Sequence, residues 1–289
     1  MALAQALVLC FGTSPVMDEK SRERLRRITL MDDRFMRVCL QEHPECAQAI
    51  LRIVMEAPSL RVREVRPQRE YANLHGREIR MDIFAEDEHG RQYDVDVQRS
   101  DEPDLHLRAG YYLGMLRANS LRKGQGYSES PEAYVIFITS GDFFQQGLPL
   151  YRFEQRMEGS GQPLGDRSHI VFVNGAMRDG DTPLSRLMHD FFCTDPDAMY
   201  VPELAQAVRD IKATEKGAGV MSGVFEEIFA EGRAEGRAEG RAEGEAQGVA
   251  KGLREAARRM LAAGSMSIEA IARMLGLDEA EVRSLAAAQ

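Results

Sequence analysis

Two aspartates and a glutamine alternate along one short segment of the chain. In residues 92–98, which read Gln-Tyr-Asp-Val-Asp-Val-Gln, they stand at Asp94, Asp96 and Gln98. Successive side chains of a β-strand point to opposite faces, so these three share one face and the intervening valines share the other. The pattern predicts a strand that is apolar on one side and carries carboxylates on the other.

A second acidic strand precedes the first. Residues 79–85 carry Asp82, and residues 86–90 form a short connection that contains Gly90, which is typical of a hairpin. Pairing of the two strands brings Asp82 toward Asp94 and Asp96. Three carboxylates crowded together repel one another unless a cation lies between them. Ligands that are all oxygen favour Mg²⁺ or Mn²⁺, and such an ion activates water for phosphodiester cleavage.

The same alternation has a plainer explanation. Asp94 and Asp96 would also suit the solvent-facing side of an edge strand, where their only role is solvation. Spacing alone gives the two explanations about equal weight.

The elements around these strands predict a mixed α/β domain. Residues 18–58 read as helices, with Pro44 at a first-turn position, and a further helix is expected over about 104–121. Residues 134–139 are continuously apolar, which indicates a strand buried on both faces. Later strands are expected at 149–153 and 169–173, and later helices at 183–192 and 202–212.

Composition excludes several classes of protein. The 289 residues carry a formal charge of −9, so a uniformly basic polyanion-binding surface is excluded, and 7% aromatics without Trp leave few residues for base stacking. No apolar run is long enough for a membrane helix. The four cysteines form no CxxC pair, which favours reduced thiols and a cytoplasmic location.

The acidic motif sits among stretches that together resemble a known family. Met81-Asp-Ile83 followed by Tyr93-Asp-Val-Asp-Val-Gln98 is similar to the PD-(D/E)XK nuclease superfamily, and in particular to the Rpn-type recombination-promoting nucleases, or PD-(D/E)XK nuclease family transposases. Further similar stretches are 31–36, 108–112, 134–139 and 187–193. The resemblance covers roughly residues 17–289.

The resemblance implies a fold and an activity. The fold is a PD-(D/E)XK restriction-endonuclease-like core with a mixed sheet, followed by an α-helical C-terminal extension. The activity is Mg²⁺- or Mn²⁺-dependent endonucleolytic cleavage of double-stranded DNA, linked to recombination, mobile elements or phage defence. Carried over by position, Asp82 and Asp96 hold the metal, Gln98 orients the attacking water, and Asp94 stands beside them.

This sequence departs from the superfamily pattern at two positions. Asp96 stands where Glu is more usual, and Gln98 stands where the superfamily has Lys, although a Gln there is familiar in the Rpn-type branch. Gln98 is neutral at any pH and orients water by hydrogen bonds only. A catalytically inactive DNA-binding or oligomeric scaffold with the same fold therefore remains the alternative to a nuclease, and an α/β protein with a merely solvated acidic strand is a third possibility.

Arg108 is the candidate phosphate ligand. It lies on the helix that follows the acidic strand, where a guanidinium could hold the scissile phosphate through two hydrogen bonds. The alternative is a surface ion pair with Asp104, four residues earlier. The neighbouring Tyr112 is expected to pack in the core, and His189 is expected to be a buried packing residue rather than a catalytic one.

The chain divides into four predicted parts. Residues 1–16 are a predicted disordered leader, 17–215 the nuclease-like domain, 216–252 a helical linker built on a four-residue Glu-Gly repeat, and 253–289 a helical tail. The repeat stacks like charges at i,i+4 and places Gly in every turn, so an isolated helix should be marginal. The repeat segment is therefore expected to be either a flexible spacer or a self-associating helix. The tail resembles a helix-turn-helix with an acidic second helix, which favours packing or homo-oligomerisation over DNA recognition.

Overall fold

The computed structural model describes residues 17–71, 79–99 and 102–287 and divides the chain into two compact units. The first unit runs to Val224 and the second covers Phe225–Gln289. The predicted leader, residues 1–16, lies outside the described residues.

The first unit begins with three helices whose starts follow from their capping residues. They are α1 (Glu19–Arg27), α2 (Asp33–Glu42) and α3 (Glu45–Val54). The carboxylate of Asp18 accepts from the backbone N–H of Ser21, and that of Asp32 accepts from the backbone N–H of Phe35, so each satisfies a free donor of its helix. Pro44 is the N-cap of α3, so it lies one residue before the first-turn position that the sequence predicts.

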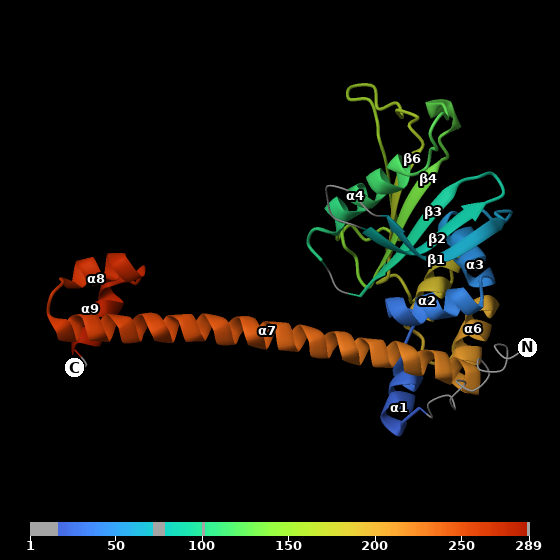
Figure 1. Ribbon diagram of the computed structural model, residues 1–289. Helices are drawn as coiled ribbons and strands as arrows, with labels where there is room; N and C mark the ends of the chain where they lie inside the picture. The colour runs from blue at the N-terminus through green and yellow to red at the C-terminus, as the bar shows by residue number, and fades with distance from the viewer. Residues whose placement is uncertain (1–16, 72–78, 100–101, 288–289) are drawn as a thin grey trace, which may run out of the picture. The chain divides into compact units, whose positions relative to one another are not determined.

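A six-stranded mixed sheet forms the centre of the first unit (Figure 1). Its order is β1-β2-β3-β4-β6-β5, with β3, β4 and β6 parallel and the other pairs antiparallel. The strands are β1 (Val62–Tyr71), β2 (Ile79–Asp87), β3 (Gln92–Gln98), β4 (Ala133–Thr139), β5 (Leu150–Glu154) and β6 (Ser168–Asn174). The predicted hairpin is the β2–β3 pair.

Helices cover both sides of this sheet, as Figure 1 shows. Helix α4 (Leu105–Ala118) packs on one face, where Leu105, Ala109 and Leu116 join Val135 and Phe137 of β4 in a buried cluster. Helices α2 and α3 pack against β1, and α2 also contacts β2 and β3. This mixed sheet with flanking helices is the predicted PD-(D/E)XK-like architecture.

Two further helices, α5 (Pro183–Phe192) and α6 (Pro202–Ala213), complete the first unit, and a buried carboxylate joins them. The side chain of Asp190 is fully buried and accepts hydrogen bonds from the backbone N–H groups of Tyr200 and Val201, the latter at 2.7 Å. Nδ1 of His189 lies 3.1 Å from the accepting Oδ1 of Asp190, and the ring packs edge-on against Tyr200. His189 therefore has a packing role, although its side chain is about one-third exposed rather than buried, 36%.

Asp190→Ala is expected to destabilise the protein by about 2–4 kcal/mol, because it leaves the buried N–H group of Val201 and the part-buried N–H group of Tyr200 without their acceptor. Urea denaturation followed by far-ultraviolet circular dichroism measures this. Asp197→Ala, which removes an exposed ion-pair partner of Arg209, is the matched control and should change the unfolding midpoint little. Equal effects of the two substitutions would show that Asp190 does not join these helices.

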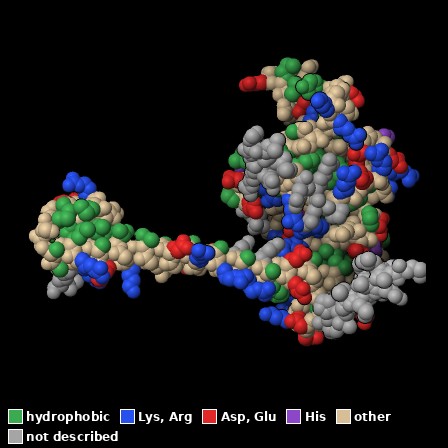
Figure 2. Space-filling model, in the orientation of Figure 1, with side chains coloured by type: hydrophobic (Ala, Val, Ile, Leu, Met, Phe, Trp, Pro, Cys, Tyr) green, Lys and Arg blue, Asp and Glu red, His purple; other side chains and the backbone are tan. Residues whose placement is uncertain are grey.

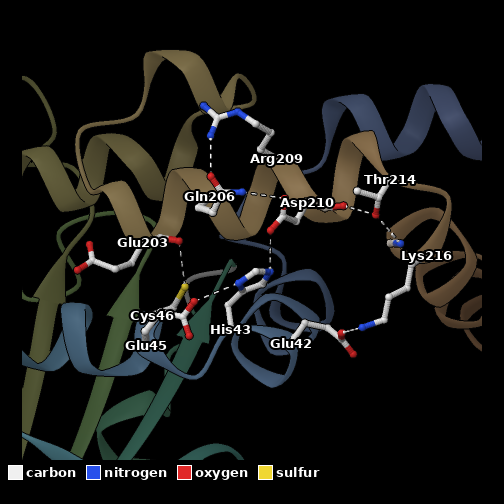
Figure 3. A network of polar contacts seen from close by, with 11 residues as sticks. Glu42, His43, Glu45, Cys46, Glu203, Gln206, Arg209, Asp210, Thr214 and Lys216 are labelled. Atoms are coloured by element: carbon white, nitrogen blue, oxygen red, sulfur yellow. Dashed lines mark hydrogen bonds and ion pairs between the residues drawn. The ribbon is translucent and has the colours of Figure 1, made fainter.

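A polar network connects the α2–α3 turn to the end of α6 (Figure 3). The ring of His43 lies between two carboxylates, with Nδ1 at 3.1 Å from Glu45 and Nε2 at 3.3 Å from Asp210. Lys216 forms an ion pair with Glu42, and both side chains, together with His43 and Asp210, line a cavity of about 310 Å³. Glycine is required at position 217, next to Lys216, because a Cβ there would lie 2.4 Å from the backbone of Ile211. The network fixes the turn from α6 into the following helix.

The repeat segment is helical, as part of α7 (Glu215–Ala263), which continues into the second unit. The end of α7 packs with α8 (Ile268–Leu275) and α9 (Glu279–Ala287) around Ala257, Ile271 and Val282. Figure 2 shows hydrophobic side chains on the face of these C-terminal helices that is turned to the viewer. Homo-oligomerisation through these helices stays a prediction. Among the described residues, no helix has the length and apolar content to cross a membrane.

Candidate active site

The acidic strand β3 is an interior strand of the sheet and not an edge. It pairs with β2 on one side and with β4 on the other, and Asp94 and Asp96 lie opposite Val135 and Phe137 of β4. Asp94 is 0% exposed and Asp96 1% exposed. The solvated-edge explanation of these aspartates is therefore wrong, because neither carboxylate reaches water. Alternation of polar and apolar residues cannot by itself distinguish an exposed face from one covered by a helix.

The hairpin brings Asp82 to Asp96. Ile83 pairs with Val95 across the β2–β3 ladder, which places the two aspartates at the next register position. Burial raises the pKa of Asp96 well above its usual range, and a hydrogen bond with the Asp82 side chain raises it further. Two of the three predicted catalytic residues are thus in contact.

Asp94 is a buried carboxylate without a hydrogen-bond partner. Neither of its oxygens has one, and burial together with the charge of Asp82 raises its pKa well above the usual range. An uncompensated buried carboxylate is costly, and structures usually satisfy such groups. A cation among the acids would offset this cost.

Arg108 reaches the acids from the second turn of α4. Its Nη2 donates to Oδ2 of Asp96 at 2.8 Å, and its Nη1 donates to Oε1 of Gln98 at 3.1 Å and to Glu102 at 3.3 Å. Burial acts to lower the pKa of Arg108, but the charge of Asp96 together with contributions from Tyr112 and Glu102 outweighs it, and the pKa is raised. The predicted site residues Asp82, Asp96, Gln98 and Arg108 therefore form one cluster. The ion-pair partners of Arg108 are Asp96 and Glu102, and not Asp104 as the surface alternative supposed.

A further acidic residue approaches from the N-terminus of α2. Burial raises the pKa of Asp33, and the neighbouring charge of Asp82 raises it further. Arg99, which directly follows β3, donates to Asp32 at 3.0 Å and so links the same helix end to the strand. Both aspartates lie in the family-like stretch 31–36, but the sequence pattern assigns neither of them a role at the site. Nothing in their local pattern indicates such a role, because the approach to Asp82 spans about fifty residues of chain.

The donor set suits a hard divalent cation. It consists of carboxylate oxygens, with the unpartnered oxygens of Asp94 among them. Within the parts of the chain that the structure describes, no three His, Cys, Asp or Glu side chains converge closely enough to enclose an ion. Mg²⁺ usually takes one or two carboxylates from the protein and completes its shell with water and substrate phosphate. Metal binding by Asp82 and Asp96 therefore stays a prediction.

Comparison with known proteins found one similarity, in the core of the first unit. Residues 58–174, which are less than half of the chain, match the family model described as PD-(D/E)XK nuclease family transposase. The match includes strands β1 to β6, helix α4 and all four predicted site residues. No curated protein and no solved structure matches the sequence.

Proposed function

We propose that the protein, whose residues 58–174 match the model of the PD-(D/E)XK nuclease family transposases, is a divalent-metal-dependent endonuclease of double-stranded DNA. The observation that carries the proposal is the contact of Asp82 with Asp96 beside the buried, unpartnered carboxylate of Asp94. A cation-free role explains poorly why the Asp82–Asp96 contact lies next to a third carboxylate, that of Asp94, which is buried without a hydrogen-bond partner. Magnesium or manganese is the proposed ion, and recombination, mobile elements or phage defence is the proposed context.

Each site residue has a proposed role. Asp82 and Asp96 hold the ion, which when bound supplies an activated water and neutralises charge on the phosphate. Gln98 orients the attacking water through its amide, since it has no charge to contribute. Asp94, unpartnered at 0% exposure, lies two residues before Asp96 on the same face of β3, and a bound ion would favour its charged form. Asp33 adds a further carboxylate at the N-terminus of α2.

Arg108 is predicted from the sequence to bind the scissile phosphate. In the structure both of its terminal nitrogens already donate hydrogen bonds to side chains of the protein. The face of the first unit seen in Figure 2 carries acidic as well as basic side chains. Cytoplasmic location stays a prediction.

A scaffold that binds DNA without cleaving it is the second candidate. The observation in its favour is the ion pair between Arg108 and Asp96, because it satisfies one of the proposed metal ligands within the protein. Under this alternative the family fold is kept and the acids have only a structural role.

Cleavage of supercoiled plasmid by the purified full chain tests the proposal. With Mg²⁺ or Mn²⁺ we expect nicked and linear products, and with EDTA none. DNA binding without cleavage in either metal would favour the scaffold. Cleavage that continues in EDTA would contradict the metal-dependent mechanism.

A further inference from the structure

Arg108 and Gln98 form a hydrogen-bonded pair that links α4 to the end of β3. The guanidinium donates from Nη2 to Asp96 at 2.8 Å and from Nη1 to Oε1 of Gln98 at 3.1 Å. Gln98 is only 7% exposed, so its amide has few other partners to choose from. One side chain thus contacts a proposed metal ligand and the proposed water-orienting residue at once.

The guanidinium is held in place on several sides. It lies over the ring of Tyr112, 5.1 Å from the centroid, and 5.5 Å from that of Phe137, while Glu102 accepts from Nη1 at 3.3 Å. Stacking and a planar fork of donors reduce the freedom of an arginine more than a single ion pair does. These contacts hold the guanidinium of Arg108 in one position, in which its Nη groups donate to acceptors of the protein.

The hydrogen bond from Arg108 determines how the side-chain amide of Gln98 is oriented. Arginine has donors and no acceptor, so the amide atom that faces Arg108 must be the oxygen. The NH₂ group of Gln98 then lies on the other side of the amide. Resting on the proposed nuclease function, we propose that Arg108 is a positioning residue that holds Gln98 with its NH₂ group as a donor toward an oxygen of the water or phosphate.

The competing role for Arg108 is direct binding of the scissile phosphate. The two roles differ in what the loss of Arg108 changes. A phosphate ligand contributes to DNA affinity, so its removal raises Kd and KM. A positioning residue acts through Gln98, so its removal lowers kcat and leaves DNA affinity nearly intact.

A double-mutant cycle on the full chain separates these roles. The variants are Arg108→Met, Arg108→Lys, Gln98→Ala and the Arg108→Met/Gln98→Ala double variant. The matched controls are Gln92→Ala, from the far end of the same strand, and Arg117→Met, from the same helix. We expect Arg108→Met to lower kcat by about 10–100-fold and to leave KM within about twofold of wild type. When Gln98 is already replaced by alanine, the fold-loss in kcat caused by Arg108→Met should be at least about tenfold smaller. Arg108→Lys, which keeps the charge and loses the fork, should fall between wild type and Arg108→Met.

Gln98→Glu tests the donor directly. The carboxylate keeps an acceptor for Arg108 but has no NH₂ group, so cleavage should fall as far as in Gln98→Ala while the protein stays folded. Cleavage by Gln98→Glu at the wild-type rate would overturn the donor role. Additive effects in the cycle, or a tenfold rise in KM and in Kd measured in EDTA with unchanged kcat, would identify Arg108 as a phosphate ligand instead.

A readout that needs no cleavage keeps this inference separate from the proposed function. The side-chain ¹⁵NH₂ resonances of Gln98 are assigned by their loss in Gln98→Ala. They should shift and narrow in Arg108→Met, as the amide becomes mobile, and stay unchanged in Arg117→Met. Unchanged resonances in Arg108→Met would overturn the positioning role whether or not the wild-type protein cuts DNA. Absence of cleavage by the wild type would instead contradict the proposed function.

Discussion

Asp96→Asn and Asp82→Asn are each expected to reduce plasmid cleavage by about 10²–10⁴-fold. Asparagine keeps the size of the side chain but removes the charged oxygen that holds the ion, and metal activation of water and phosphate supplies several kcal/mol to this class of reaction. Initial rates of nicking in saturating Mn²⁺ measure the loss. The two residues are in contact and are proposed to hold the same ion, so the double variant should lose little more than either single one.

Asp104→Asn is the control for these substitutions. Asp104 is an exposed aspartate at the start of α4, outside the Asp82–Asp96 contact, and its substitution should leave the rate within about twofold of wild type. Cleavage that persists in Asp96→Asn and Asp82→Asn would mean that the activity arises from other residues or from a contaminant. The assignment of the site would then fail, even if the protein preparation cuts DNA.

Asp94→Asn is expected to stabilise the protein at neutral pH by about 1–3 kcal/mol, which corresponds to several degrees in Tm. Burial and the charge of Asp82 raise the pKa of Asp94 in the folded state above its usual value near 3.8. The folded protein therefore holds this proton more tightly than the unfolded chain does. The favourable contribution of the protonated group is complete below about pH 3.8 and is lost as the pH rises through the folded pKa.

The difference in stability between Asp94→Asn and wild type should accordingly grow as the pH rises from about 4 toward 8. Thermal unfolding at a series of pH values in EDTA measures it, with Asp104→Asn as the control that shows no such trend. Added Mn²⁺ should raise the Tm of wild type more than that of Asp94→Asn, because the ion offsets the buried charge. A difference that is constant with pH, or one that shrinks as the pH rises, would contradict the buried-charge explanation.

Local patterns were sufficient to predict the elements that build the site. The alternation at 92–98 and the Gly-containing connection before it predict the β2–β3 hairpin, and the apolar run at 134–139 predicts the buried strand β4. The contact of Asp82 with Asp96 follows from the same hairpin, because a two-residue period and antiparallel pairing leave few registers. These predictions depend on residues close together in the chain.

The burial and the partners of the site could not be predicted in this way. The position of β3 between β2 and β4 depends on a parallel pairing across forty residues, and this pairing determines that the carboxylates are buried. The ion pair of Arg108 with Asp96 and the approach of Asp33 to Asp82 depend on how α4 and α2 pack on the sheet. Helical spacing made Asp104 an equally reasonable partner for Arg108, and only the packing decides between them.

Binding of Mn²⁺ to the full chain, measured by the loss of the free-ion electron paramagnetic resonance signal, tests the proposed metal site most directly. Wild type and Asp104→Asn should bind the ion with the same affinity, and Asp96→Asn and Asp82→Asn should each lose at least about tenfold. Equal Mn²⁺ affinity in all four proteins would show that Asp82 and Asp96 do not hold the ion.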